Sequence, residues 1–329
     1  MIKSIKFLWQ DFVAFIRADF KPLPYIYALT VIALSIVIAY NTDFGKSISR
    51  GYAPFPSEYK YVNSILMYSF LYFLVAVPIL IMQGKYRSIN KWHFYLKGFT
   101  LTAILGFTDV FSWFYYLDIS KFNDIKEIQF LSLFLWSTKA LVFQLPVLLL
   151  LRFWIDRKVK GLYGICRGNH HVKAYLWLYV IILPILIVTA FTQDFQDYYP
   201  ICKPWYFGAD TALTSAGLFG LPVGINLLML EFAYISTFFM VELLFRGAFV
   251  IGMGSAIERS AVLPMVAVYV ALHFGKPVLE TMSAIFGGFA LGVLAYQSRH
   301  IWGGVIIHMG IAFAIEVIRH LQYYILGIR

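Results

Sequence analysis

The feature that most constrains this chain is a series of long apolar segments. Three of them, at 24–40, 62–82 and 174–191, contain no charged residue. A helix needs about 20 apolar residues to cross the hydrocarbon core of a bilayer. Only 13% of the residues are charged, whereas soluble domains contain about 25%. The sequence therefore predicts an all-α, polytopic bundle of transmembrane helices.

Nine apolar segments are expected to form about eight or nine membrane helices. They cover 24–40, 62–82, 98–117, 128–151, 174–191, 219–252, 262–274, 279–297 and 301–326. The seventh is short for a full crossing, so it is expected to be a partial or buried helix. A polar, Pro-containing stretch divides the chain. The predicted parts are an N-terminal segment 1–23, a first transmembrane group 24–191, a connecting loop 192–212 and a C-terminal helical core 213–329 that carries any active site.

The net charge of +10 is spread over loops between the apolar segments rather than gathered in one run. The loops richer in Lys and Arg alternate with poorer ones, which is the positive-inside pattern. We therefore expect a cytoplasmic N-terminus and a multi-pass protein of a bacterial plasma membrane. The basic residues are expected to meet anionic membrane lipid, not nucleic acid.

The first 23 residues are expected to form an amphipathic helix at the membrane interface, because Phe7, Leu8, Phe12 and Phe15 recur at helical spacing. Asp11, Arg17 and Asp19 interrupt the apolar run, so a cleavable signal is not expected.

The two cysteines, Cys166 and Cys202, suggest neither a disulfide framework nor a zinc motif. Cys166 together with His170 and His171 could bind a metal ion, but a solvated loop cluster is the favoured interpretation.

Ionisable residues at membrane depth are unevenly distributed. The first five apolar segments hold Asp109 and Lys139, which are expected to pair and join two helices. The last four hold seven such residues, namely Glu231, Glu242, Arg246, His273, Glu280, His308 and Glu316. A charge at the bilayer centre costs at least about 2.5–3.5 kcal/mol, so groups kept there usually line a cavity. A site is therefore expected in the C-terminal half.

Glu242 and Arg246 stand four residues apart, on one helix face within pairing reach. Alone they suggest a buried salt bridge, but His273 and His308 on two further helices favour a convergent site. Glu242, His273 and His308 are a set that can hold Zn²⁺ and a water molecule whose pKa it lowers. Alternatively, Glu242 and one histidine activate water directly while the other histidine stabilises the oxyanion. Either arrangement predicts a hydrolase.

These residues resemble the motifs of the CAAX-protease and bacteriocin-processing family (CPBP, or Abi) of intramembrane metalloproteases. VELLFRG (241–247) is similar to the E-E-x-x-x-R motif, YVALHFG (269–275) to F-x-x-x-H, and IIHMGIA (306–312) to H-x-x-x-N/D. The resemblance covers roughly 220–320 and implies hydrolysis of peptide bonds in membrane-associated substrates. By position, Glu242, Arg246, His273 and His308 are the implied active-site residues.

Two positions depart from the family pattern. Val241 replaces the glutamate that activates water in the family, and Ala312 replaces the Asn or Asp that helps to hold the oxyanion. Glu280 is expected to substitute for the missing carboxylate, because a turn at Gly275 and Pro277 can fold it back beside His273. Glu231 is expected to line the same cavity, about 16 Å from Glu242 along the helix. Glu316 is expected to be a packing residue.

Three functions follow from this reading. The first is a CAAX-protease-like membrane endopeptidase with Glu242, Arg246, His273, His308 and Glu280 as its site. The second is a pseudoprotease that keeps the fold as a scaffold. The third is a transporter whose glutamates and histidines form a proton path. Glycines at 287, 288, 292, 303 and 304 are expected to allow close helix approach or a lateral opening.

Overall fold

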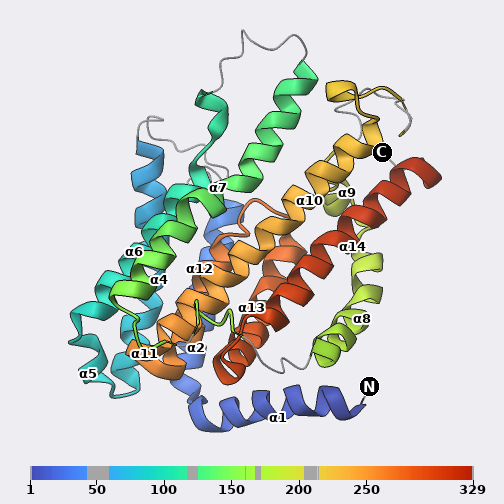
Figure 1. Cartoon of the computed structure of the whole chain (residues 1–329). Helices are drawn as coiled ribbons and strands as arrows, with labels where there is room; N and C mark the ends of the chain where they lie inside the picture. Colours follow the sequence, from blue (N-terminus) through green and yellow to red (C-terminus); the bar gives the residue numbers. More distant parts are fainter. Residues whose placement is uncertain are drawn as a thin grey trace.

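A computed structural model describes residues 2–42, 59–116, 125–159, 161–166, 172–203, 213 and 215–327. The nine apolar segments lie largely on helices within these residues, so the predicted helical bundle is confirmed (Figure 1). The long elements are α1 (Ile2–Asp19), α2 (Pro22–Asn41), α4 (Lys60–Met82), α6 (Trp92–Val110), α7 (Ile125–Trp154), α8 (Val172–Thr189), α10 (Val223–Glu242), α12 (Val262–Ala271), α13 (Val278–Ser298) and α14 (Trp302–Leu326). Short helices α5 (Tyr86–Ile89), α9 (Gln193–Tyr198) and α11 (Gly254–Ile257) lie in the connections.

Seven helical stretches of the described chain are long and apolar enough to cross a membrane, which makes the chain an integral membrane protein. They are Pro22–Asn41, Lys60–Met82, Lys126–Trp154, Val172–Thr189, Val223–Ala271, Val278–Ser298 and Trp302–Leu326. The expected segment 98–117 is not among these seven, and its helix α6 has other bounds, since it starts at Trp92 and ends at Val110. Lys97 and Asp109 lie inside α6 and lower its hydropathy.

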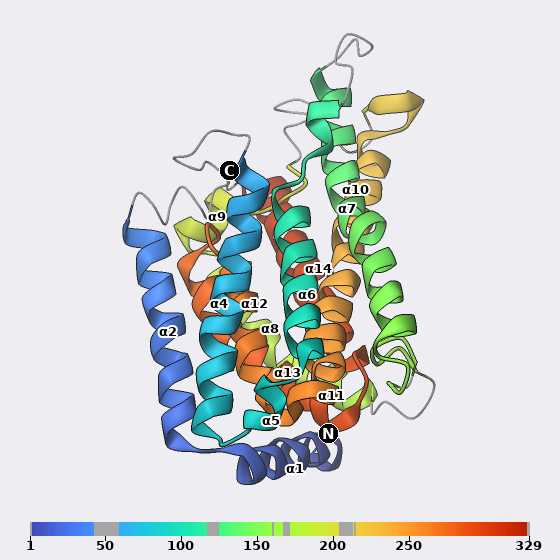
Figure 2. The ribbon, with the colours of Figure 1, turned by 90° about the vertical axis from the view of Figure 1, so that its left-hand side faces the viewer.

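Helix α1 lies across one end of the bundle, roughly perpendicular to the long helices (Figures 1 and 2). Leu8 and Phe15 on it are buried, while Phe7 and Trp9 are exposed. Phe15 packs edge-on against Phe289 of α13. The apolar positions at helical spacing therefore form an amphipathic helix, as expected. Its contact with lipid and the side of the membrane on which it lies stay predictions.

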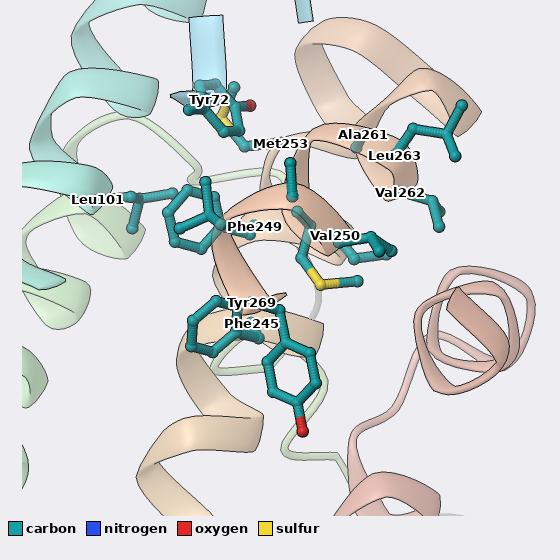
Figure 3. Packing of buried hydrophobic residues seen from close by; sticks show 14 of the residues in the cluster. Tyr72, Leu101, Phe245, Phe249, Val250, Met253, Ala261, Val262, Leu263 and Tyr269 are labelled. Atoms are coloured by element: carbon teal, nitrogen blue, oxygen red, sulfur yellow. The ribbon is translucent and has the colours of Figure 1, made fainter. Parts of the chain in front are cut away.

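The seventh segment is a short buried helix, as expected. All ten residues of α12 are buried, and the helix packs against α2, α4 and α13. It is preceded by a π-helical segment, Leu243–Gly252, that continues α10 and is also buried throughout. Figure 3 shows the interior around these two elements, where Phe245 stacks on Phe249 and meets the Tyr269 ring edge-on. The Tyr72 ring is tilted against Phe249.

One core cluster contains residues from Phe15 to Val305, so helices of both predicted transmembrane groups share it. The division of the chain at 192–212 stays a prediction, and residues 204–212 of that loop are outside the described part. The paired His170 and His171 also lie outside it, so their proposed grouping with Cys166 stays open.

Asp109 and Lys139 link α6 to α7, but not by the expected carboxylate–ammonium contact. Lys139 Nζ donates to the backbone carbonyl of Asp109 at 2.9 Å. The Asp109 carboxylate instead accepts a hydrogen bond from the Tyr68 hydroxyl at 2.9 Å. The link is structural, as expected. Lys139 binds backbone carbonyls at the end of α6, near Val110, where these carbonyls lack partners within the helix.

Candidate active site

Glu242 is the centre of a buried group, because both Arg246 and His308 contact its carboxylate. Glu242 ends α10 and is 0% exposed, as is Arg246, one turn later in the π-helical segment. Arg246 NH1 lies 3.0 Å from Glu242 Oε1, and His308 Nδ1 lies 2.9 Å from the same oxygen. The guanidinium also lies over the Tyr269 ring, 4.3 Å from its centroid. The expected pairing of Glu242 with Arg246 is therefore present, and it includes a histidine from α14.

Gly304 explains how α14 reaches this group. A Cβ atom at Gly304 would lie 1.9 Å from Glu242 Oε2, so only glycine leaves room for the buried carboxylate. The neighbouring Gly303 makes room for Tyr175, and Gly288 makes room for Tyr269. Nothing lies within 4 Å of a Cβ at Gly287. Close approach is thus the role of most of the predicted glycines, but not of Gly287.

His273 follows α12 and is placed by a sharp turn. Its Nδ1 lies 2.8 Å from the carbonyl oxygen of Tyr269, four residues earlier. A carbonyl oxygen only accepts hydrogen bonds, so Nδ1 carries the proton. In the neutral ring, Nε2 then has a free lone pair. Gly275 has a positive φ of 84°, which turns the chain so that Pro277 can begin α13.

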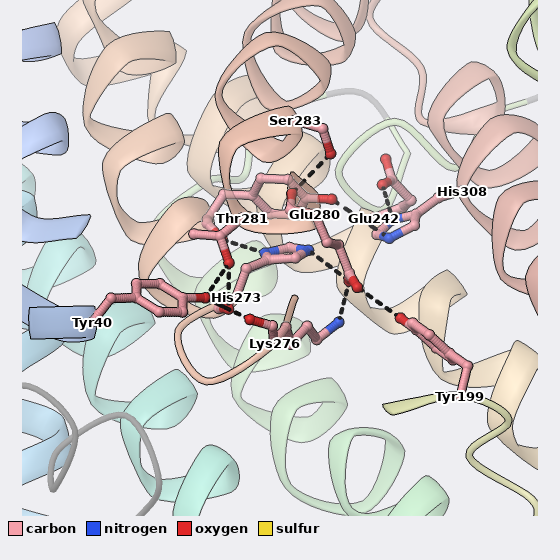
Figure 4. Close-up of polar contacts among 10 residues, drawn as sticks. Tyr40, Tyr199, Glu242, His273, Lys276, Glu280, Thr281, Ser283 and His308 are labelled. Carbon is pink, nitrogen blue, oxygen red and sulfur yellow. Dashed lines mark hydrogen bonds and ion pairs between the residues drawn. The ribbon is translucent and has the colours of Figure 1, made fainter. Parts of the chain in front are cut away.

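This turn brings Glu280 back beside His273, the placement expected from the sequence (Figure 4). Glu280 Oε1 lies 3.9 Å from His273 Nε2 and 2.8 Å from Lys276 Nζ. The Tyr199 hydroxyl donates to Glu280 Oε2 at 2.9 Å. Burial and the nearby Glu280 carboxylate raise the pKa of Tyr199 well above its usual range, so the hydroxyl stays protonated and keeps donating. The separation of 3.9 Å exceeds a direct hydrogen bond and suits a water molecule in contact with both groups.

A cavity of about 260 Å³ adjoins both histidines. Its lining includes His273, His308 and Lys276 from the C-terminal half. It also includes Asp109 and Lys139. The expectation of a site formed by the C-terminal half alone is therefore incomplete, because α6 and α7 supply part of the wall. Glu242 and Glu280 are not lining residues; each contacts a residue that is.

The carboxylates farther along α10 and α14 lie elsewhere. Glu231 is not a lining residue of this cavity, contrary to the expectation; its Oε1 is 2.8 Å from Nε2 of His320. Glu316 is 1% exposed and accepts the backbone N–H of Ile201, in keeping with the expected packing role.

The expected zinc set is not assembled in this conformation. Among the described residues, the ligand atoms that lie within 4.8 Å of one another belong to Cys202, Glu231 and Glu316, not to the set with His273 and His308. Glu242 Oε1 is already engaged by Arg246 and by His308. Glu242 Oε2 is buried without a hydrogen-bond partner among the described residues. Zinc at Glu242, His273 and His308 therefore stays a prediction, as does the metal-independent alternative.

The two departures from the motifs lie in apolar surroundings. Val241 is half-buried and lines the cavity. Ala312 is buried in a separate apolar cluster with Phe238 and Leu227. Neither position therefore offers a polar group to a reacting peptide.

Tyr199 and Lys276 were not identified as site residues from the sequence. Tyr199 belongs to the loop before α10, and its contact with Glu280 joins positions 81 residues apart. Lys276 had a local signal, since it stands one helical turn before Glu280.

Residues 222–314 match the family model of the Rce1-like type II CAAX prenyl endopeptidases. The match contains Glu242, Arg246, His273, Glu280 and His308. Comparisons with curated proteins and with solved structures gave no match. The resemblance to which the motifs pointed is confirmed over residues 222–314, which match the Rce1-like model of the CPBP family.

Proposed function

We propose that the chain is an intramembrane endopeptidase that hydrolyses peptide bonds of membrane-associated substrates. The observation that carries the proposal is that His273, a lining residue of the cavity, has an unprotonated Nε2 that lies 3.9 Å from the Glu280 carboxylate. The family match supports the same class of reaction.

In this mechanism a water molecule sits to one side of the pair and hydrogen-bonds to both His273 Nε2 and Glu280 Oε1. Its oxygen attacks the carbonyl carbon of the peptide, and its proton passes to His273 Nε2. The carbonyl oxygen becomes an oxyanion, which the Tyr269 hydroxyl and a protonated His308 Nε2 stabilise by donating hydrogen bonds. Breaking the C–N bond requires a proton on the leaving nitrogen, and His273 supplies the one that it accepted.

His308 is suited to the second role because its other nitrogen is held by Glu242. The Nδ1–H bond to the carboxylate fixes the orientation and the tautomer of the ring. Nε2 then faces the Tyr269 hydroxyl, 3.5 Å away. Arg246 and His308 both contact Glu242 Oε1, so this oxygen is already engaged by two protein groups. We therefore assign positioning to Glu242 and Arg246, and water activation to His273 with Glu280.

The test is peptide release by the purified protein in proteoliposomes. The substrates are lipid-anchored peptides with and without a prenylated CAAX terminus, and products are identified by mass spectrometry. We expect cleavage by the wild type, loss of cleavage in His273→Ala and His308→Ala, and retention in Glu231→Gln. Cleavage that survives His273→Ala in folded protein would refute the assignment.

A pseudoprotease is the second candidate, favoured by Val241, Ala312 and the neutralised Glu242. It predicts no cleavage of any substrate by folded wild-type protein. A transporter is less well supported, because Glu231 is not in the cavity and pairs with His320 instead. It predicts substrate uptake that depends on Glu231 and tolerates polar replacements of the histidines. The bacterial plasma membrane and the cytoplasmic N-terminus remain part of the proposal.

A further inference from the structure

A second group of ligand-type side chains lies away from the cavity. Cys202 follows α9, Glu231 is on α10 and Glu316 is on α14. One ligand atom from each lies within 4.8 Å of the other two. Cys202 is 0% exposed and Glu316 is 1% exposed, whereas the Glu231 side chain is 13% exposed, so the group lies inside the protein at its edge. Three segments of the chain therefore converge on one buried point.

The polar atoms of this group are only partly satisfied by the protein. Glu231 Oε2 is buried and has no hydrogen-bond partner among the described residues, and the same is true of His320 Nδ1. Buried polar atoms without partners are costly, and each such atom in a native protein calls for an explanation. Two adjacent buried carboxylates add mutual repulsion when both are ionised. A bound cation would give Glu231 Oε2 a partner and offset the repulsion between the two carboxylates.

We propose that Cys202, Glu231 and Glu316 bind one divalent metal ion of the zinc class. A thiolate with carboxylates is a donor set that Zn²⁺ accepts, whereas Mg²⁺ and Ca²⁺ prefer oxygen alone. Ligand atoms about 2.0–2.3 Å from a tetrahedral zinc ion lie roughly 3.3–3.8 Å apart, so the three atoms need only a small contraction. His320, whose Nε2 lies 2.8 Å from Glu231 Oε1, would orient that carboxylate. The fourth position is left for water.

The site would also hold the segment that carries Tyr199. The backbone N–H of Ile201 donates to Glu316 at 2.9 Å, and Arg319 Nε donates to the carbonyl of Tyr199 at 3.0 Å. Tyr199 in turn contacts Glu280. A metal bound to Cys202 and Glu316 would thus fix the loop that contacts the candidate active site.

The test uses Co²⁺ alone as the probe, because cobalt bound to a thiolate shows a charge-transfer absorption band. Purified full-length protein in detergent is treated with chelator, loaded with CoCl₂ and examined by absorption and by metal analysis. We expect close to one equivalent of Co²⁺ per chain and a thiolate band. Cys202→Ala and Cys202→Ser should abolish the band, and Glu316→Gln should weaken metal binding. Folding of each variant is checked by thermal melting.

Cys166→Ala is the matched control, since it removes the other cysteine and should keep the band. His308→Ala should keep it too, which separates this site from the candidate active site. Absence of a band in the wild type would overturn the proposal, and the two carboxylates would then share a proton. A band that persists in Cys202→Ala, or bound cobalt that is lost in His308→Ala, would also overturn it. None of these outcomes depends on whether the protein cleaves peptides.

Discussion

Two histidine–glutamate pairs face each other in this molecule, and they differ in how tightly they are closed. His308 and Glu242 touch directly at 2.9 Å, and Arg246 occupies the same carboxylate oxygen. His273 and Glu280 are 3.9 Å apart, with a free nitrogen on the imidazole side. The Glu242 side chain is 0% exposed, whereas that of Glu280 is 18% exposed. The closed pair has the features of a positioning element, and the open pair has room for a water molecule.

A glutamate's place in the sequence motif and its role in the chemistry are different properties here. Glu242 lies in the recognisable motif but is neutralised by its neighbours. Glu280 lies outside the motif but is adjacent to a histidine with an available lone pair. Replacing a residue in each pair should therefore have different consequences for stability and for rate.

The largest effect is expected on stability, from Glu242→Ala. The change leaves the Arg246 charge buried without a carboxylate, which should lower the free energy of unfolding by about 3–5 kcal/mol. The measurement is an unfolding titration in mixed micelles. The matched variant is Glu242→Leu with Arg246→Met, which removes both charges and should recover most of the loss. Glu280→Gln should cost much less, because Lys276 is 22% exposed and can reach water. Equal losses for Glu242→Ala and Glu280→Gln would break the comparison.

The second largest loss of stability is expected from Gly304→Ala. The added methyl group would overlap Glu242 Oε2, so α14 must move away or the carboxylate must leave its partners. Overpacking of this kind typically costs about 1–3 kcal/mol. Gly287→Ala is the control, because its methyl group meets nothing within 4 Å and alanine is the better helix former. Thermal melting of the two variants side by side should show a lower melting temperature only for Gly304→Ala. A Gly304→Ala variant as stable as the wild type would contradict the tight packing of the closed pair.

The smallest effect is expected from Tyr199→Phe. The variant loses the hydroxyl that donates to Glu280 Oε2, and a hydrogen bond of about 1 kcal/mol corresponds to roughly a fivefold change in rate. We expect kcat to fall by about that factor with little change in KM. Tyr198→Phe, in the adjacent tyrosine, should leave the rate unchanged, although Tyr198 lines the cavity and Tyr199 does not. An effect of Tyr198→Phe as large as that of Tyr199→Phe would show that general packing, not the hydrogen bond to Glu280, is responsible.

The sequence was sufficient for the helices and for most of the site. Apolar length located all nine segments, and the shortness of 262–274 predicted a buried helix. Helical spacing placed Arg246 beside Glu242, and the Gly275–Pro277 turn placed Glu280 beside His273. Each of these contacts joins residues that are close along the chain, so helix geometry and turn residues are enough to predict it.

Relations between distant segments could not be predicted in the same way. Tyr199 reaches Glu280, and Lys139 reaches the cavity, only through the packing of α7, α10 and α13. Glu231 was expected in the cavity from its distance along α10, but distance along one helix does not fix which neighbour it faces. The structure turns it instead toward Cys202, Glu316 and His320 on other segments.

The most direct test of the central claim is the cleavage rate of Glu280→Gln against that of Glu242→Gln, each corrected for its folded fraction. Glu280 supports the base His273 by holding the attacking water and by stabilising the positive charge that forms on the ring, so Glu280→Gln should lose much of the about 10²–10⁴-fold acceleration that general-base catalysis supplies. Glu242→Gln should lose no more than about tenfold, because the amide oxygen can still accept from His308. A wild-type rate in Glu280→Gln, together with an inactive Glu242→Gln, would contradict the account and return the base to the motif glutamate.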